Sequence, residues 1–254
     1  MIELGERLES VSAQEALAWG LETFGDRLAI GTSFQAAGMA IVDMAARLRP
    51  DVRVFTIDTG RLPLETHDLM IEVERRYGIR VDVIGPDPGE VDAMVSRHGP
   101  DLFYEAASKR MLCCEIRKVR PLARKLATLD AWVTGLRRGQ SAARAEVRKL
   151  EIDSANGSIV KLNPLADWSS EQVAAYNRDH KVPQHPLYAQ GYTSIGCGPC
   201  TRPPMPGQGP RSGRWWWEND TRKECGIHFT PLGKVRRDVD ILLEEIAGAV
   251  AIRS

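Results

Sequence analysis

The chain contains 254 residues, of which 43% are hydrophobic, so it is long enough for one large α/β domain or two small ones. Its 34 basic and 34 acidic side chains cancel, so no global charge indicates DNA, RNA or a membrane surface as a partner. The first ten residues lack an apolar core and no apolar stretch reaches the length of a bilayer span, which predicts a cytoplasmic protein.

The first half of the chain alternates helical and extended patterns. A capping box at residues 12–15 predicts a helix that ends near residue 23. Predicted strands at 27–33, 52–57, 79–84 and 131–134 alternate with predicted helices at 39–48, 63–77 and 113–126. This alternation predicts an α/β fold, with a mostly parallel sheet and helices on both faces.

Ligands of such folds bind beyond the carboxyl ends of the strands. Polar or glycine-containing loops follow three of the predicted strands, at residues 31–38, 58–61 and 135–144. We therefore expect the binding site of this chain among these three loops.

The second half changes character after about residue 150. Residues 146–152 and 158–162 predict paired β segments, a capping box at 169–172 predicts a helix to about residue 180, and 235–252 reads as an amphipathic tail helix. Residues 183–232 are rich in proline and glycine, and we expect their three adjacent tryptophans, 215–217, to pack under the tail. We predict an α/β domain over 1–202, a mobile catalytic segment over 203–232 and a tail helix over 233–254.

Four of the five cysteines fit one soft-metal site. Cys113 and Cys114 are adjacent in a predicted helix, and Cys197 and Cys200 lie in a Cys-Gly-Pro-Cys loop. In a reducing compartment such motifs are more often ligands or catalysts than disulfides. Both zinc and iron–sulfur clusters take four thiolates. Adjacent cysteines reach one zinc ion only with strain, so the spacing favours a [4Fe–4S] cluster and leaves zinc as the alternative.

The fifth cysteine, Cys225, stands apart between Arg222-Lys223-Glu224 and Gly226-Ile227-His228. A thiolate is a strong nucleophile, and nearby cations lower the pKa of a thiol. The residues around Cys225 predict that it is a nucleophile. The alternative is an inert, partly buried cysteine.

In chain order, these motifs resemble the assimilatory adenylylsulfate (APS) reductases, the iron–sulfur branch of the APS/PAPS reductase family, over about residues 27–230. The resemblance is carried by Cys113-Cys114-x-x-Arg117-Lys118, Thr134-Gly135-x-Arg137-Arg138-x-x-Ser141, Cys197-Gly-Pro-Cys200-Thr-Arg-Pro203, Gly213-Arg214-Trp215-Trp216-Trp217 and Glu224-Cys225-Gly226-x-His228. One loop departs from the family: it reads Ser-Phe-Gln-Ala-Ala-Gly over residues 33–38, where many relatives carry Ser-Phe-Ser-Gly-Ala.

The resemblance implies a fold like the adenine-nucleotide α-hydrolases, which is Rossmann-like. It implies reduction of APS to sulfite and AMP, in assimilatory sulfate reduction and cysteine biosynthesis. Cys225 would attack the sulfur of APS and keep a thiosulfonate, which thioredoxin or a glutaredoxin-like dithiol protein would then cleave. The implied cofactor is a [4Fe–4S] cluster, with ligands Cys113, Cys114, Cys197 and Cys200.

Attack of a thiolate on an anionic sulfonyl group needs fixed cations that offset the repulsion and stabilise the leaving phosphate. Lys118 follows Cys114 by four residues, so one helix could present it to both cluster and substrate. By resemblance, the catalytic residues are Cys225, His228 and Lys118, and the substrate-binding residues are Ser33, Asp58, Thr59, Gly60, Arg61, Arg137, Arg144, Arg211 and Arg214.

Other functions fit the sequence less well. Reduction of PAPS, the 3′-phosphorylated substrate, is the nearest alternative, and dual specificity occurs in the family. An ATP pyrophosphatase would need a Ser-Gly-Gly-x-Asp-Ser loop, but no acidic residue lies between Ser33 and Asp43. A zinc-bound nucleic-acid-binding module could use the basic clusters and tryptophans, but the neutral total charge disfavours it. The sequence leaves a homo-oligomer open.

Overall fold

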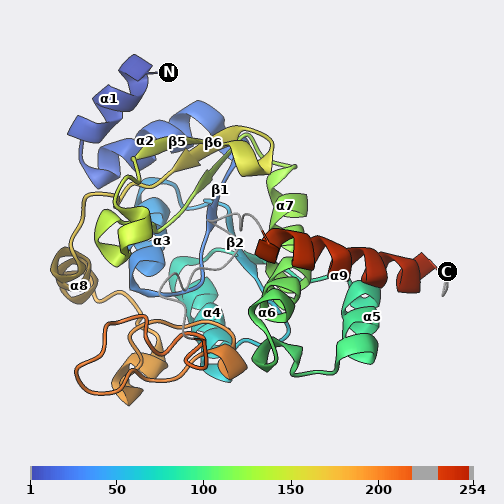
Figure 1. The fold of residues 1–254 in the computed structure, drawn as a ribbon. Helices are drawn as coiled ribbons and strands as arrows, with labels where there is room; N and C mark the ends of the chain where they lie inside the picture. The colour runs from blue at the N-terminus through green and yellow to red at the C-terminus, as the bar shows by residue number, and fades with distance from the viewer. Residues whose placement is uncertain (1, 219–233, 252–254) are drawn as a thin grey trace.

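The structure is a computed structural model that describes residues 2–218 and 234–251. Its centre is a six-stranded sheet with the strand order β3-β2-β1-β4-β6-β5 (Figure 1). Neighbouring strands run parallel, except that β5 at one edge pairs antiparallel with β6. The predicted mostly parallel sheet of an α/β fold is therefore confirmed.

Each strand lies within or beside a range predicted from the sequence. The strands are β1 (Leu28–Gly31), β2 (Val54–Ile57), β3 (Val81–Ile84), β4 (Ala131–Val133), β5 (Leu150–Asp153) and β6 (Ile159–Leu162). The predicted pairing of residues 146–152 with 158–162 is found as the antiparallel pair β5–β6, with Leu150 opposite Leu162.

The helices are α1 (Ile2–Ser10), α2 (Ala13–Phe24), α3 (Ala36–Leu48), α4 (Leu64–Tyr77), α5 (Pro88–His98), α6 (Ala107–Cys114), α7 (Arg120–Leu126), α8 (Ser170–Asp179) and α9 (Lys234–Ala251). Both predicted capping boxes form. Ser12 and Ser169 accept hydrogen bonds from the backbone N–H groups of Glu15 and Gln172, whose side chains accept the N–H groups of the two serines.

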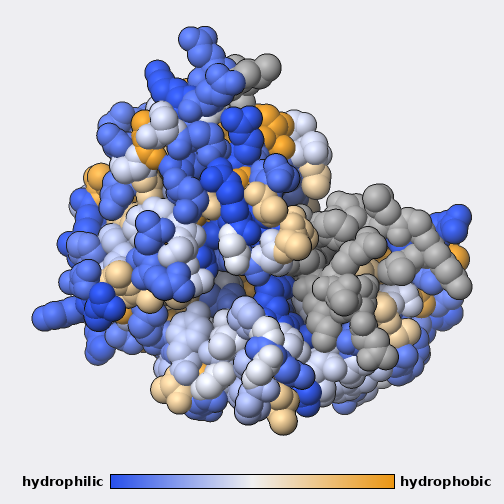
Figure 2. All heavy atoms as spheres, turned by 60° about the vertical axis from the view of Figure 1, so that its left-hand side comes forward, coloured by the Kyte–Doolittle hydropathy of each residue, from blue (hydrophilic) through white to orange (hydrophobic). Residues whose placement is uncertain are grey.

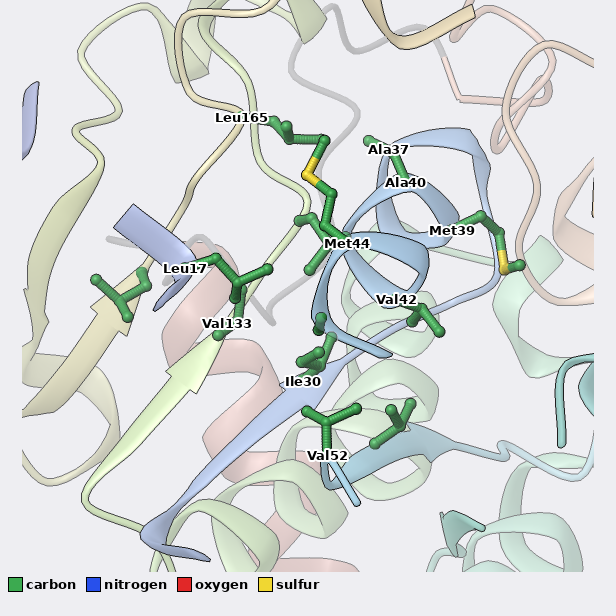
Figure 3. Packing of buried hydrophobic residues seen from close by; sticks show 14 of the residues in the cluster. Leu17, Ile30, Ala37, Met39, Ala40, Val42, Met44, Val52, Val133 and Leu165 are labelled. Carbon is green, nitrogen blue, oxygen red and sulfur yellow. The ribbon is translucent and has the colours of Figure 1, made fainter. Parts of the chain in front are cut away.

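Alternating residues of the central strands face opposite sides of the sheet, as the two-residue period of a strand requires. Ile30, Val54 and Val133 belong to a core cluster that also contains buried residues of α2, α3, α4 and α8. Figure 3 shows Leu17, Ile30 and Val133 in this cluster beside α3. Ala29, Phe55 and Trp132 form a separate cluster with α7 on the other face.

A third core cluster lies beyond the sheet. It joins buried residues of α5, α6 and α9 to the cysteines and to Trp215. α9 packs against α5 and α6, and Figure 1 shows it as the red helix that lies across them. The predicted tail helix therefore exists and helps to bury the segment around the cysteines.

The structure differs from the predicted helices in several places. α1 and α5 were not predicted, and the helix predicted at 113–126 is the end of α6, a π-helical turn and α7. α3 begins at Ala36 rather than at residue 39, because Gln35 is extended and its carbonyl already accepts the N–H of Met39. After the strand predicted at 79–84, the sequence Gly85-Pro86-Asp87-Pro88-Gly89 is typical of a turn, so it predicts no helix where α5 lies. Asp87 instead caps it, with its side chain accepting the N–H of Glu90, and Pro88 occupies the first turn, where a missing N–H costs nothing.

The Pro- and Gly-rich segment is described over residues 183–218, and it packs around Trp215 while residues 205–210 are exposed. Trp215 is fully buried, its backbone N–H donates to the carbonyl of Cys200, and Thr201 forms a β-bridge with Arg214. The expected packing role of the tryptophans is thus confirmed for Trp215. The predicted three-part division stays a prediction, because residues 219–233 lie outside the described part.

The face seen in Figure 2 is mostly hydrophilic, with small, separated hydrophobic areas. Within the described residues, no helix is both long enough and apolar enough to cross a membrane.

Candidate active site

A cavity of about 670 Å³ opens at the carboxyl ends of β1, β2 and β4. It is lined by the loops after these strands, the first turns of α3 and α8, and parts of the segments 184–196 and 210–215. β1 has β2 on one side and β4 on the other, so the strand order reverses here. Open parallel sheets bind ligands at such a reversal, and the cavity has the size of a small-molecule site.

The loop after β1 is held in one conformation by buried contacts. The N–H of Phe34 donates to Thr32 Oγ1 (3.0 Å), and Phe34 has a φ of 56° and a fully buried ring. A positive φ is unusual for an aromatic residue and persists only where the surrounding structure fixes it. The hydroxyl of Tyr188 accepts the N–H of Ala36 (3.0 Å) and so occupies the first turn of α3.

The cavity is strongly cationic. Its lining contains no described Asp or Glu, and its cations are Lys118, Arg137, Arg144, Arg211 and Arg214. The Nε–H groups of Arg137 and Arg214 are buried without a hydrogen-bond partner among the described residues. Buried unpaired donors are costly, and guanidinium groups suit carboxylate, phosphate or sulfate. This lining therefore fits an anionic ligand.

Arg137 is anchored from one side. Its Nη1 donates to the carbonyl of Trp168 (3.0 Å) and its Nη2 to Ser170 Oγ (3.2 Å), both near the start of α8. Burial lowers its pKa from the ordinary value. A bound anion would reverse that penalty, since an opposite charge favours the charged form.

The four predicted ligand cysteines come together in a second, smaller cavity of about 10 Å³. All four are buried, and none forms a disulfide. Among the described residues, no three His, Cys, Asp or Glu side chains are arranged to hold one metal ion. The other residues that line this cavity are Arg61, Phe103, Arg110, Arg117 and Lys118.

The thiols around this cavity differ in their tendency to ionise. Burial, with the neighbouring thiols, raises the pKa of Cys113 and Cys200 to about 12. Burial would also raise the pKa of Cys197, but Lys118 and a hydrogen bond with Thr59 (Oγ1–Sγ 3.3 Å) lower it overall. Several of these cysteines can therefore be ionised together only if positive charge lies beside them. Their chemistry fits a centre of iron ions that takes thiolate ligands, with cations around it.

Lys118 lines both cavities. It lies in a π-helical turn, Glu115–Val119, that joins α6 to α7. Pro121 lacks an N–H and so cannot donate to the carbonyl of Arg117 four residues earlier, and a wider turn accommodates this. Arg117, from the same turn, donates through Nη1 to the carbonyl of Thr59 (2.7 Å). The turn thus connects the loop after β2, the cysteines and the large cavity.

Trp215 lies between two arginines. The guanidinium carbon of Arg110 is 4.5 Å from the centre of a Trp215 ring, and that of Arg214 is 4.8 Å away. Arg110 also forms a two-pronged ion pair with Glu218 (2.8 and 3.0 Å). Burial alone would lower the pKa of Arg110, but Glu218 and Cys114 raise it overall.

The structure brings together most of the predicted site residues. Those that line the large cavity are Ser33, Thr59, Lys118, Arg137, Arg144, Arg211 and Arg214. Cys225 and His228 lie outside the described residues.

Three predicted substrate-binding residues, Asp58, Gly60 and Arg61, lie outside the lining of the large cavity. Asp58 accepts the N–H of Gly60 (2.8 Å) and pairs with His67 (2.8 Å). Arg61 lines the cysteine cavity instead, where it stacks on Phe103 and donates to the carbonyl of Pro100 (2.6 Å).

Several residues of the two cavities are not among the predicted site residues. Gln35 and Tyr188 line the large cavity, and Arg110 lines the cysteine cavity. Arg110 carried a usable signal, since it precedes Cys113 by one helical turn. Gln35 lies in the loop at 31–38, where the binding site is expected, but its contact with Ile195, 160 residues away, could not be predicted. Tyr188 carried no signal, because its partner Ala36 is 152 residues away.

Comparison with known proteins agrees with this geometry. The family model described as phosphoadenosine phosphosulfate reductase domain matches residues 27–203. The chain belongs to this family. An adenosine 5′-phosphosulfate reductase of Allochromatium vinosum is 50% identical over 203 residues, which cover 80% of this chain and 79% of the relative. The 5′-adenylylsulfate reductase 3 of Arabidopsis thaliana is 44% identical over 89% of this chain and 50% of its own length.

Solved structures give the same fold. A phosphoadenylyl-sulfate (PAPS) reductase from Candida auris, in complex with phosphate, has a TM-score of 0.67 at 30% identity, covering 79% of this chain and 95% of its own. A yeast FAD synthetase in complex with FAD has a TM-score of 0.53 at 12% identity, covering 79% of this chain and 73% of its own. The second likeness concerns the fold alone and agrees with a Rossmann-like α/β architecture.

Proposed function

We propose that this member of the phosphoadenosine phosphosulfate reductase family reduces adenosine 5′-phosphosulfate to sulfite and AMP. The observation that carries the proposal is that Lys118 lines two cavities at once. One cavity is cationic and nucleotide-sized, and the other is enclosed by the four cysteines. The relatives that share up to half of its residues are named as reductases of this substrate.

The substrate fits the large cavity by charge and by place. A phosphosulfate is an extended anion, and the arginines of the lining offer planar, paired donors to such oxyanions. Arg137 and Arg214 have buried Nε–H groups that such an anion could accept. The adenosine would lie over the loop after β1, which includes Ser33.

A [4Fe–4S] cluster would be held by Cys113, Cys114, Cys197 and Cys200. Their burial, their free thiols and the four cations around the cavity support this assignment. When bound, the cluster would tie α6 to the loop at 197–200 and add an electrostatic field beside the substrate. Free cysteines also fit a reducing compartment such as the cytoplasm.

The chemistry assigned to the chain's own residues has two steps. The thiolate of Cys225 attacks the sulfur of the substrate, the bond from sulfur to the bridging phosphate oxygen breaks, and AMP leaves. Lys118, Arg144, Arg211, Arg214 and His228 would offset the negative charge that gathers on the phosphate and sulfonyl oxygens. A dithiol protein such as thioredoxin then attacks the Cys225 sulfur, which releases sulfite and forms a mixed disulfide that the second thiol resolves.

The test is the intact mass of the protein after anaerobic incubation with APS or with PAPS, without reductant. We expect APS to add one sulfonate to Cys225, and reduced thioredoxin to remove it as sulfite. An adduct that forms with PAPS but not with APS would support the mechanism and identify PAPS, not APS, as the substrate. No adduct with either, on protein with its full iron content, would refute the thiosulfonate mechanism.

A matched variant separates catalysis from cofactor binding. Cys225→Ser should form no adduct and release no sulfite, but should keep the brown colour of a cluster. If Cys225→Ser loses the colour, Cys225 is a ligand and the assignment of the four other cysteines is wrong.

A further inference from the structure

Gln35 connects the large cavity to the loop that carries Cys197. Its Oε1 accepts the N–H of Ile195 (2.9 Å), while its Nε2 donates to Ser33 Oγ (3.0 Å). The orientation of the amide is fixed by chemistry. A backbone N–H can only donate, so the amide oxygen must face Ile195.

The carbonyl of Ile195 is held from the opposite side. Arg214 Nη1 donates to it (3.0 Å), and Ile195 is only 4% exposed. Both polar backbone groups of one buried residue thus depend on side chains from distant segments. A buried backbone group that loses its partner is costly, so these two contacts determine where Ile195 lies.

The next two residues show how closely the contacts of Gln35 and Arg214 with Ile195 approach the cysteines. A Cβ on Gly196 would lie 2.2 Å from Arg214 Nη2, so only glycine allows the guanidinium this position. Cys197 follows directly, and Arg214 is one of the cations that lower its pKa. Any shift of Ile195 therefore moves both Arg214 and the cysteine loop.

A ligand in the large cavity can reach the residues of this connection. Ser33, Gln35, Ile195 and Arg214 all line the large cavity. A nucleotide that contacts Ser33 or Arg214 acts on the side chains that hold Ile195.

We propose that Gln35 is a positioning residue that couples occupancy of the nucleotide cavity to the loop Gly196–Cys200 through the backbone of Ile195. The proposal rests on the proposed function, because it takes an adenine nucleotide as the ligand of the large cavity. It predicts that ligand binding at one cavity protects the cysteines of the other, and that Gln35 carries this protection. Such couplings between sites are commonly about 5- to 150-fold.

The test measures iron release from the anaerobic holoprotein to a chelator, with and without saturating AMP. We expect AMP to slow release in the wild-type protein, and Gln35→Ala to reduce this protection ratio roughly five- to tenfold. Gln35→Glu keeps an acceptor for the Ile195 N–H, so it should retain the ratio at saturating AMP while weakening AMP binding through its charge. Gln14→Ala, an exposed exchange on α2, is the control.

A merely structural role predicts a different result. Loss of packing alone would speed iron release and lower Tm. It would leave unchanged the ratio between the iron-release rates without and with AMP. An unchanged ratio in Gln35→Ala, or no protection by AMP in the wild-type protein, overturns the proposal. If Gln35→Ala does not fold, Gln35→Met replaces it, because methionine has similar length but no carbonyl.

Failure of the proposed function is distinguishable from failure of this inference. If the anaerobically purified protein contains no iron, the proposed cofactor is refuted. The coupling through Gln35 is then tested by the rates at which Cys197 and Cys200 are alkylated with and without AMP, measured from peptide masses. A normal sulfonate adduct on Cys225, together with wild-type protection ratios in Gln35→Ala, would refute the inference alone.

Discussion

The ion pair between Arg110 and Glu218 should be among the most sensitive single contacts of this protein. Both side chains are buried, at 3% and 9% exposure, and they form two parallel hydrogen bonds of 2.8 and 3.0 Å. Glu218→Ala would leave the Arg110 guanidinium buried without its carboxylate partner. Breaking a buried pair from one side costs about 3–5 kcal/mol.

The expected loss is large enough to measure directly. For a chain of this size, each kcal/mol corresponds to about 2–4 °C in Tm, so Glu218→Ala should lower Tm by about 6–20 °C. The control is the neighbouring pair formed by Lys109 of α6 and Glu105, which precedes this helix; their side chains are 27% and 52% exposed. Glu105→Ala should cost no more than about 1 kcal/mol, because exposed pairs contribute little.

A double-mutant cycle decides whether the pair itself is responsible. The assay is urea unfolding, followed by circular dichroism on anaerobic samples of equal iron content. The double variant Arg110→Met with Glu218→Ala removes both charges, so it should cost clearly less than the sum of Arg110→Met and Glu218→Ala measured singly. Additive costs would refute the reasoning, because they would mean that the two charges do not stabilise each other.

Three further predictions concern other buried groups. Burial lowers the pKa of His185 from its ordinary 6.5, so the unfolded chain binds the proton more tightly; Tm should fall as pH drops below about 6.5, and His185→Asn should flatten this dependence. Gly196→Ala should displace the Arg214 side chain, which weakens AMP binding about tenfold in calorimetry and also lowers Tm, because the buried Ile195 carbonyl loses its donor; unchanged affinity would contradict this. Asp43→Ala should cost about 3 kcal/mol in urea unfolding, because Tyr77 and Tyr176 lose a buried acceptor; a loss below 1 kcal/mol would contradict this.

Local patterns were sufficient to predict most of the sheet. Runs such as Val-Phe-Thr-Ile in β2 are apolar and β-branched, and the two Ser-x-x-Glu/Gln boxes fix helix starts through contacts three residues apart. α5 was missed because Asp-Pro-Gly reads equally well as a turn or as a cap with proline in the first helical turn. Only the burial of Ala93 and Met94 against the third core cluster decides between them.

The candidate site was predictable where residue chemistry is specific, and not where contacts are distant. Cysteines are few, so their meeting in one small cavity could be expected from two motifs. The cavity that Arg61 lines could not be predicted, because an arginine after a strand can turn to either cavity and its stacking on Phe103 is a tertiary contact. Gln35 was noticed only as a departure from a pattern, since its function depends on Ile195, 160 residues away.

The charge distribution around the large cavity has a kinetic consequence. The whole chain is formally neutral, yet five cations and no described carboxylate line this cavity. The compensating acidic side chains therefore lie elsewhere, and the molecule presents a localised positive field to its surroundings. A recessed field of one sign accelerates the encounter with small anions, and dissolved salt weakens it. The rate of substrate capture should therefore depend on ionic strength much more steeply than the net charge of this protein suggests.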